Sequence, residues 1–262
     1  EDVTDLVSAQ RVAAWGDVAR RIAHEIKNPL TPIRLSAERI KRKFSPQVGE
    51  ESEQLERMTD VIVRQTNELS RIVDEFSQFA RMPEPDCRPT NFSEFLRGTI
   101  LLQESGQPHV KFTLDLPKEA IWIDADASMI GRAVTNLLKN AGESIDDRKA
   151  YQPDHEGEIR ITAAQTDRLV VVEISDNGAG LPEDRARLLE PYVTNRVSGT
   201  GLGLSIVVKT IEEHGGTLTL IDAEPFGAGA QAGAMAVIRL KSTAVSANRF
   251  TAWSPSQCMS DV

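Results

Sequence analysis

The sequence predicts two domains, a helical hairpin at the N-terminal end and an α/β sandwich after it. Apolar residues within the first 80 positions recur every three or four residues, which is the period of a helix with one buried face. Beyond residue 90, short strand and helix patterns alternate, which is typical of one mixed sheet covered by helices. The segment Met82-Pro83-Glu84-Pro85 separates the two patterns, because closely spaced prolines end a helix and stiffen a linker.

These changes in pattern define the expected domain boundaries. The expected units are a hairpin domain at 1–82 with helices at about 5–44 and 50–81, a linker at 83–89, a sandwich domain at 90–242, and a tail at 243–262 that is expected to be disordered. The sandwich is expected to contain strands at 110–116, 120–123, 158–163, 169–175, 216–221 and 234–240, and helices at 128–144 and 201–214.

Two apolar stripes run along the predicted hairpin. The first consists of Val18, Ile22, Ile26, Leu30, Ile33, Ala37, Ile40 and Phe44. The second consists of Leu55, Met58, Ile62, Gln65, Leu69, Ile72, Phe76 and Phe79, in which Gln65 is the only polar member and the steps alternate between three and four as in a coiled coil. A single hairpin buries little of two such stripes. We therefore expect two chains to pair into a four-helix bundle, which makes the protein a homodimer.

Composition restricts the possible partners and surroundings. The net charge of −9 argues against a nucleic-acid binder, which would carry a basic surface. The two cysteines, Cys87 and Cys258, lack metal-ligand spacing and fit a reducing, cytoplasmic setting. No apolar run of about 18 residues is present, so we expect this stretch not to span a membrane. Because the chain begins with Glu1, we expect it to be a fragment of a longer protein.

His24 interrupts the pattern of the first helix. It lies two residues from both Ile22 and Ile26, a rotation of about 200° on a helix, so its side chain is expected to point away from the apolar stripe. Asn28 lies one helical turn further on, on the same face. A lone exposed histidine is usually an inert surface residue, so its role depends on the segments around it.

The segment from His24 to Ile33, His-Glu-Ile-Lys-Asn-Pro-Leu-Thr-Pro-Ile, resembles the phospho-acceptor box of sensor histidine kinases, most like the nitrogen-regulation (NtrY) type. The resemblance implies that His24 accepts a phosphoryl group from ATP and that Glu25 is the adjacent base. A carboxylate that takes one imidazole proton leaves the other nitrogen free to attack phosphorus. The resemblance also implies that Asn28 positions a water molecule in the reverse, phosphatase reaction.

The segment from Asn136 to Ala141 resembles the asparagine box of the same kinases. Asn136 and Asn140 are four residues apart, so both amides share one helix face. The resemblance implies that this face meets ATP and that Asn140 is a ligand of Mg²⁺, a cation that prefers oxygen ligands. These kinases often carry a basic residue three positions after the second asparagine, where this sequence has Glu143.

Two glycine-rich segments complete the resemblance, which extends from residue 11 to about 241. The first, Asp176-Asn177-Gly178-Ala179-Gly180, implies that Asp176 accepts a hydrogen bond from the adenine amino group, with Gly178 and Gly180 close to the ring. The second precedes a helix and implies phosphate binding by Gly199, Thr200, Gly201, Leu202, Gly203 and Leu204. Between them, 190–196 is a variant of the aromatic box, with further nucleotide contacts implied for Tyr192, Thr194 and Arg196. We expect 181–200 to form a mobile lid over ATP.

The resemblance implies an α + α/β protein, with a dimeric four-helix-bundle domain followed by an ATP-binding domain of the histidine kinase and Hsp90-like ATPase type. The implied partner is the receiver domain of a response regulator, and the implied parent protein is an inner-membrane sensor with its kinase core in the cytoplasm. A related ATPase without phosphotransfer, or a dimerisation scaffold that only binds nucleotide, is the alternative. Neither alternative would use the box that begins at His24.

Overall fold

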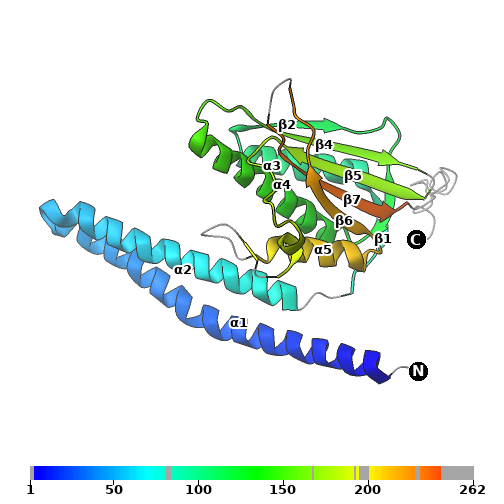
Figure 1. The fold of residues 1–262 in the computed structure, drawn as a ribbon. Helices are drawn as coiled ribbons and strands as arrows, with labels where there is room; N and C mark the ends of the chain where they lie inside the picture. Colours follow the sequence, from blue (N-terminus) through cyan, green and yellow to red (C-terminus); the bar gives the residue numbers. More distant parts are fainter. Residues whose placement is uncertain are drawn as a thin grey trace, which may run out of the picture. The chain divides into compact units, whose positions relative to one another are not determined.

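The computed structural model describes residues 3–80, 84–166, 168–191, 193–194, 201–227 and 231–242. It divides into two compact units, the first containing the two long N-terminal helices and the second containing the strands and the later helices (Figure 1). Most of the predicted linker 83–89 precedes the first strand, which already begins at Arg88. The predicted tail 243–262 lies outside the described residues. Over the described residues, no helix has the length and apolar character needed to cross a bilayer.

The first unit is an antiparallel helical hairpin. Helix α1 spans Val3–Phe44 and remains helical through Pro29 and Pro32. After two short 3-10 turns, helix α2 spans Ser52–Ala80. Lys27 forms an ion pair with Asp74 across the hairpin, which ties the segment around His24 to the neighbouring helix.

Small and β-branched side chains form most of the seam inside the hairpin. On α1 the buried residues are seven positions apart, and they are Ala23, Leu30 and Ala37. On α2 they have the same spacing, and they are Thr59, Thr66, Val73 and Ala80. Each threonine hydroxyl donates to a carbonyl of the preceding turn, Thr59 to Leu55 O at 2.9 Å and Thr66 to Ile62 O at 2.6 Å. The hydroxyls are therefore satisfied although the side chains are buried.

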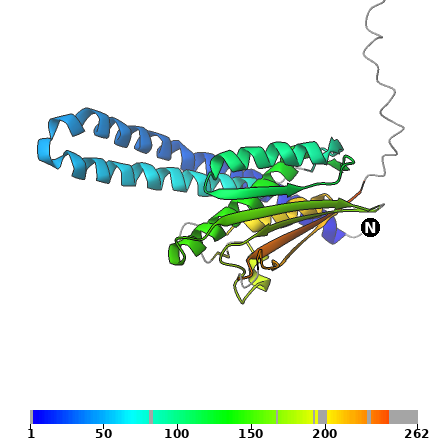
Figure 2. The same cartoon turned by 90° about the horizontal axis from the view of Figure 1, so that it is seen from above.

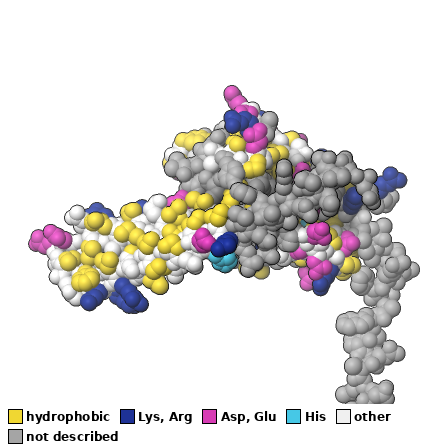
Figure 3. Space-filling view, turned by 90° about the horizontal axis from the view of Figure 1, so that it is seen from below, with side chains coloured by type: hydrophobic (Ala, Val, Ile, Leu, Met, Phe, Trp, Pro, Cys, Tyr) yellow, Lys and Arg dark blue, Asp and Glu magenta, His cyan; other side chains and the backbone are white. Residues whose placement is uncertain are grey.

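Most of the large members of the predicted apolar stripes remain exposed in one chain. Of the first stripe, only Leu30 and Ala37 are buried among the residues whose side chains are described. The exposed members include Ile22, Ile26, Ile33, Ile40, Phe44, Met58, Ile62, Leu69 and Ile72, each between 37% and 60% exposed. Hydrophobic side chains cover much of the hairpin surface in Figure 3. Single exposed apolar residues are ordinary, but a continuous row of them indicates an interaction surface.

The second unit is built on a five-stranded mixed sheet in the order β2-β4-β5-β7-β6. Its strands are β2 (Val110–Asp115), β4 (Gly157–Gln165), β5 (Leu169–Asp176), β6 (Thr217–Asp222) and β7 (Ala234–Lys241). Only β2 and β4 are parallel within this sheet, and the other neighbours pair antiparallel. A separate antiparallel pair joins β1 (Arg88–Asn91) to β3 (Trp122–Ala125).

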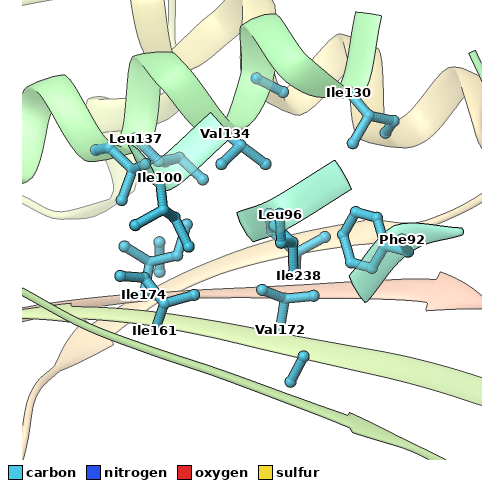
Figure 4. Packing of buried hydrophobic residues seen from close by; sticks show 14 of the residues in the cluster. Phe92, Leu96, Ile100, Ile130, Val134, Leu137, Ile161, Val172, Ile174 and Ile238 are labelled. Atoms are coloured by element: carbon cyan, nitrogen blue, oxygen red, sulfur yellow. The ribbon is translucent and has the colours of Figure 1, made fainter. Parts of the chain in front are cut away.

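Three helices cover one face of the sheet: α3 (Phe92–Gly106), α4 (Ala127–Tyr151) and α5 (Gly203–Glu213) (Figure 2). Along β4, buried residues alternate with partly exposed ones, so one face of the strand packs against the helices. Figure 4 shows the resulting core, where Leu96 and Ile100 of α3 and Val134 of α4 lie over the sheet. The predicted α/β sandwich is confirmed, and α3 is an element that the sequence reading did not identify.

Helix α4 is longer than the predicted 128–144 and has a well-formed N-terminus. Asp126 is the N-cap residue, and its Oδ1 accepts from the backbone N–H groups of Ser128 and Met129 at 2.9 and 3.1 Å. The extension to Tyr151 carries two further turns past Ser144. These additional turns reach the end of β5, where the site described next is formed.

Candidate functional site

The segment around His24 is exposed on α1. The side chains of His24, Glu25 and Asn28 are all exposed, as expected from the position of His24 off the apolar stripe. Glu25 Oε1 accepts from Arg21 Nε at 3.2 Å. Neighbouring positions on a helix diverge by about 100°, so Glu25 and His24 do not face each other squarely on α1. The exposure leaves the imidazole open to a phosphoryl donor.

One face of α4 presents four polar side chains at intervals of four residues: Asn136, Asn140, Ser144 and Arg148. Burial increases along this polar row, from the half-buried asparagines to Ser144 at 8% and Arg148 at 6% exposure. The structure thus confirms that the two predicted asparagines share a face. Glu143 lies beside this row and pairs with Lys139 at 3.8 Å, so the acidic residue three positions after Asn140 has a cationic partner within α4.

Asp176 ends β5 and is buried, with 5% of its surface exposed. Its Oδ1 accepts from the backbone N–H of Gly178 at 2.8 Å and from the Ser144 hydroxyl at 3.3 Å. The hydroxyl oxygen of Ser144 in turn accepts from the backbone N–H of Ala179 at 3.1 Å. A buried carboxylate is stable only where hydrogen bonds replace its lost hydration. Ser144 and the loop backbone supply those bonds, so Asp176 is held in a fixed orientation.

The side-chain amide of Asn177 binds the start of the same loop to β4 through two hydrogen bonds. Its Oδ1 accepts from Glu158 N–H at 2.8 Å, and its Nδ2 donates to Glu156 O at 2.8 Å. Both ends of the amide are therefore used on the backbone at the start of a neighbouring strand. Asn177 thus positions the loop, a role that the sequence resemblance did not assign to it.

Two glycines allow close backbone approach at this loop. A Cβ on Gly178 would lie 2.5 Å from the carbonyl carbon of Ser144 and 2.6 Å from its oxygen. A Cβ on Gly233 would lie 2.7 Å from the carbonyl carbon of Asp176. Gly180 has a φ of 83°, in the left-handed region that favours glycine. Gly178 and Gly180 were predicted from the sequence, whereas Gly233, just before β7, was missed.

The second glycine-rich segment leads into α5. Gly201 has a φ of 68°, Leu202 is buried, and α5 begins at Gly203 and continues through Leu204. The first turn of a helix directs its backbone N–H groups outward along the axis, which suits an anion. The predicted contacts Tyr192, Arg196, Gly199 and Thr200 lie outside the described residues. Thr194 is described and exposed.

The first part of the predicted lid segment 181–200 lies within the described residues and contains a short helical turn. A 3-10 turn covers Ala186–Leu189, and Arg185 Nη2 lies 2.8 Å from Asp222 Oδ2 at the end of β6. This half-exposed ion pair is a contact between the first part of the lid segment and the end of β6. A group of three or more His, Cys, Asp or Glu side chains able to hold a metal is absent from the described part of the chain. Mg²⁺ bound at the candidate nucleotide site would have the Asn140 amide oxygen and phosphate oxygens as its ligands.

Family models match both units of the chain. Residues 14–85 match the His Kinase A (phospho-acceptor) domain, and residues 125–244 match the histidine kinase-, DNA gyrase B- and HSP90-like ATPase domain. The chain belongs to the sensor histidine kinases. The sequence resemblance that began at His24 is confirmed.

Curated relatives place this histidine kinase core near one type. It is 52% identical over 233 residues to nitrogen regulation protein NtrY of Azorhizobium caulinodans, covering 88% of this chain and 30% of the relative. It is 39% identical to a putative sensor histidine kinase NtrY-like of Rickettsia conorii, covering 86% of this chain and 36% of the relative. The chain therefore spans about a third of the length of these relatives.

Solved structures share the fold. Full-length ShkA in complex with AMPPNP matches with a TM-score of 0.65 at 20% identity, over 87% of this chain and 46% of that one. Histidine kinase ThkA in complex with response regulator protein TrrA matches with a TM-score of 0.60 at 24% identity, over 90% of this chain and 64% of that one. At these identities the likeness supports the arrangement of a helical hairpin followed by an α/β unit.

The packing of Gly178 gives a direct test of the loop geometry. Gly178→Ala should weaken ATP binding at least about tenfold, because a Cβ there must displace the backbone of Ser144, which cannot move as a flexible side chain would. Isothermal titration calorimetry measures the change. The matched control is Gly98→Ala on α3, where a Cβ meets nothing within 4 Å. This control should bind ATP like the parent and be slightly more stable. Unchanged affinity in Gly178→Ala would contradict the close approach.

Proposed function

We propose that this chain uses ATP to phosphorylate its own His24 and passes the phosphoryl group to an aspartate of a response-regulator receiver domain. We also propose that it removes that group from the regulator. The observation that carries the proposal is the presence in one chain of an exposed His24 in a phospho-acceptor segment and a buried, oriented Asp176 in an ATPase-type loop. ThkA, which shares the fold, forms a complex with a response regulator protein, and this supports the proposed class of partner.

The proposed chemistry assigns each side chain one task. Asp176 accepts a hydrogen bond from the adenine amino group, which selects the base. One nitrogen of the neutral His24 imidazole attacks the γ-phosphorus, the bond to the bridging oxygen breaks and ADP leaves, and Glu25 takes the proton from the other nitrogen. The Asn140 amide oxygen is a suitable ligand for Mg²⁺, which neutralises phosphate charge when it is bound. Asn136 lies one turn away on the same polar row and would contact the same nucleotide.

Asn28 is proposed to serve the reverse reaction. A neutral amide both donates and accepts hydrogen bonds, so it can hold a water molecule in line with the phosphoaspartate of the regulator. Hydrolysis of that acyl phosphate needs no proton from His24. The exposure of Asn28 on the same helix as His24 leaves both reactions accessible to the partner from one side.

The proposed assembly is a homodimer through the hairpin. The exposed row of large apolar side chains on α1 and α2 is the surface that a second hairpin would cover, and the His Kinase A family match supports this. By its likeness to NtrY, we propose that the protein acts in nitrogen regulation. A cytoplasmic kinase core within a membrane-anchored sensor stays a prediction.

Radiolabelled ATP tests the function as a whole. After incubation with γ-labelled ATP, the parent chain should carry label that is lost in acid, as expected for phosphohistidine. His24→Gln should lose the label and keep ATP affinity, because the acceptor and the nucleotide loop belong to different units. Asp176→Asn should lose both the label and the affinity for ATP. ATP should bind at least about tenfold more weakly, because the new amide presents a donor to the adenine amino group. Persistent label on His24→Gln, or a parent that releases only free phosphate, would support an ATPase instead.

Glu25→Ala and Asn28→Ala should separate the two directions of phosphoryl flow. Glu25→Ala should lower the rate of autophosphorylation by about 10²–10⁴-fold if Glu25 is the general base. Asn28→Ala should keep measurable autophosphorylation and lose phosphatase activity toward the phosphorylated regulator. Alanine favours helix, and both sites are exposed, so circular dichroism should show unchanged helix content. If Asn28→Ala instead lost autophosphorylation and kept phosphatase activity, these assignments would be refuted.

Leu69→Glu should convert the dimer to a monomer, because Leu69 is 48% exposed in one chain and belongs to the apolar row that a partner would bury. A charge buried at that interface without a counterion is strongly unfavourable. Multi-angle light scattering measures the mass. The control is Leu102→Glu on α3, where the leucine is 73% exposed outside the hairpin. This control should remain dimeric, and a dimeric Leu69→Glu would count against the hairpin interface.

A further inference from the structure

Arg148, in the last turn of α4, is a buried cation for which the proposed chemistry has no role. It is 6% exposed, and among the described residues only Arg148 and Asp176 are charged and buried. Burying a guanidinium is costly unless its donors find acceptors. No carboxylate lies within 4.0 Å of it in the described part of the chain, so its stabilisation comes from other groups.

Two nitrogens of Arg148, Nη1 and Nε, donate to backbone carbonyls and to one side-chain amide. Nη1 donates to Asn177 O at 2.8 Å, and at longer range to Gly178 O at 3.4 Å and Gln231 O at 3.5 Å. Nε donates to Gln152 Oε1 at 2.9 Å, which fixes the guanidinium plane from the end of its own helix. The position near the C-terminus of α4 also favours a cation, because the helix dipole is negative there.

Two successive peptide groups of the loop are held at both ends. In a trans peptide the C=O and the N–H point in opposite directions. The peptide from Asn177 to Gly178 has its oxygen on Arg148 and its N–H on Asp176 Oδ1, both at 2.8 Å. The next peptide has its oxygen, Gly178 O, near Arg148 and its N–H, on Ala179, bonded to Ser144 O at 3.0 Å.

We propose that Arg148 is a positioning residue for nucleotide-base recognition, which it serves by fixing the peptide plane whose N–H orients the carboxylate of Asp176. Arg148 acts without touching the base. Removing its donors frees the Asn177 carbonyl to rotate, and the N–H that holds Asp176 Oδ1 rotates with it. This inference rests on the proposed function, because it assumes that Asp176 recognises the base.

The guanidinium group of Arg148 is planar and carries several N–H donors in fixed directions, which explains why arginine is needed at this position. A lysine would bring the same charge, but its single ammonium has no fixed plane and cannot hold Gln152 and the Asn177 carbonyl in one geometry. The expected order of ATP affinity is therefore the parent, then Arg148→Lys, then Arg148→Met.

The test is calorimetric binding of ATP and of GTP to the full chain, well below the melting temperature of each variant. Arg148→Met should bind ATP about tenfold more weakly and show a smaller preference for ATP over GTP, because the misoriented carboxylate no longer selects the amino group. Arg148→Lys should be intermediate, which keeps the test valid if Arg148→Met fails to fold.

Two controls separate positioning from general loss of stability. Arg132→Met removes an exposed cation from the same helix and should bind ATP like the parent. Ile100→Ala removes a buried side chain from α3 and should lower the melting temperature without changing the preference between nucleotides. Parent-like affinity and preference in the Arg148 variants, or an equal loss of preference in Ile100→Ala, would overturn the inference. A parent chain that does not bind ATP would instead refute the proposed function.

Discussion

Hydrogen bonds between the C-terminal half of α4 and the loop after β5 hold the candidate nucleotide site together. Asp176 is buried, and its charge is tolerated because Ser144 and the N–H of Gly178 replace the water that it has lost. The same loop approaches α4 so closely that Gly178 has no room for a side chain. The polar row on α4 therefore links the predicted metal end, at Asn140, to the base end, at Asp176, through a single rigid element.

The residues proposed to carry the chemistry were visible in the sequence, because such residues stand out against the pattern around them. His24 lies off an apolar stripe, Asn136 and Asn140 repeat at one helical turn, and Asp176 follows a buried strand and precedes glycines. The residues that position them were not visible. Ser144 and Arg148 are 32 and 29 residues from their partners in the loop, and the groups that they meet there are mostly backbone atoms. Backbone acceptors leave no signature in the type of residue.

Two other differences between the predictions from the sequence and the structure have simple physical reasons. Helix α3 was missed although Phe92, Leu96 and Ile100 are spaced for one buried face and Asn91 caps its start, so the signal was present. In the hairpin, the sequence stripes correctly mark large apolar residues, but the buried seam within one chain consists mainly of Ala23, Ala37, Thr59, Thr66 and other modest side chains. The periodicity identifies apolar faces without showing which face meets which neighbour.

The modest seam of the hairpin has a consequence for folding. Helices joined mainly by alanine and threonine bury little apolar area, so one hairpin gains little of the free energy that a stable domain needs. If a second copy supplies the rest, folding and association of this unit are one bimolecular equilibrium. Its stability then depends on the number of copies in the cell, and each tenfold dilution removes about 1.4 kcal/mol per mole of dimer. Expression level would thereby set the fraction of hairpins that are folded at all.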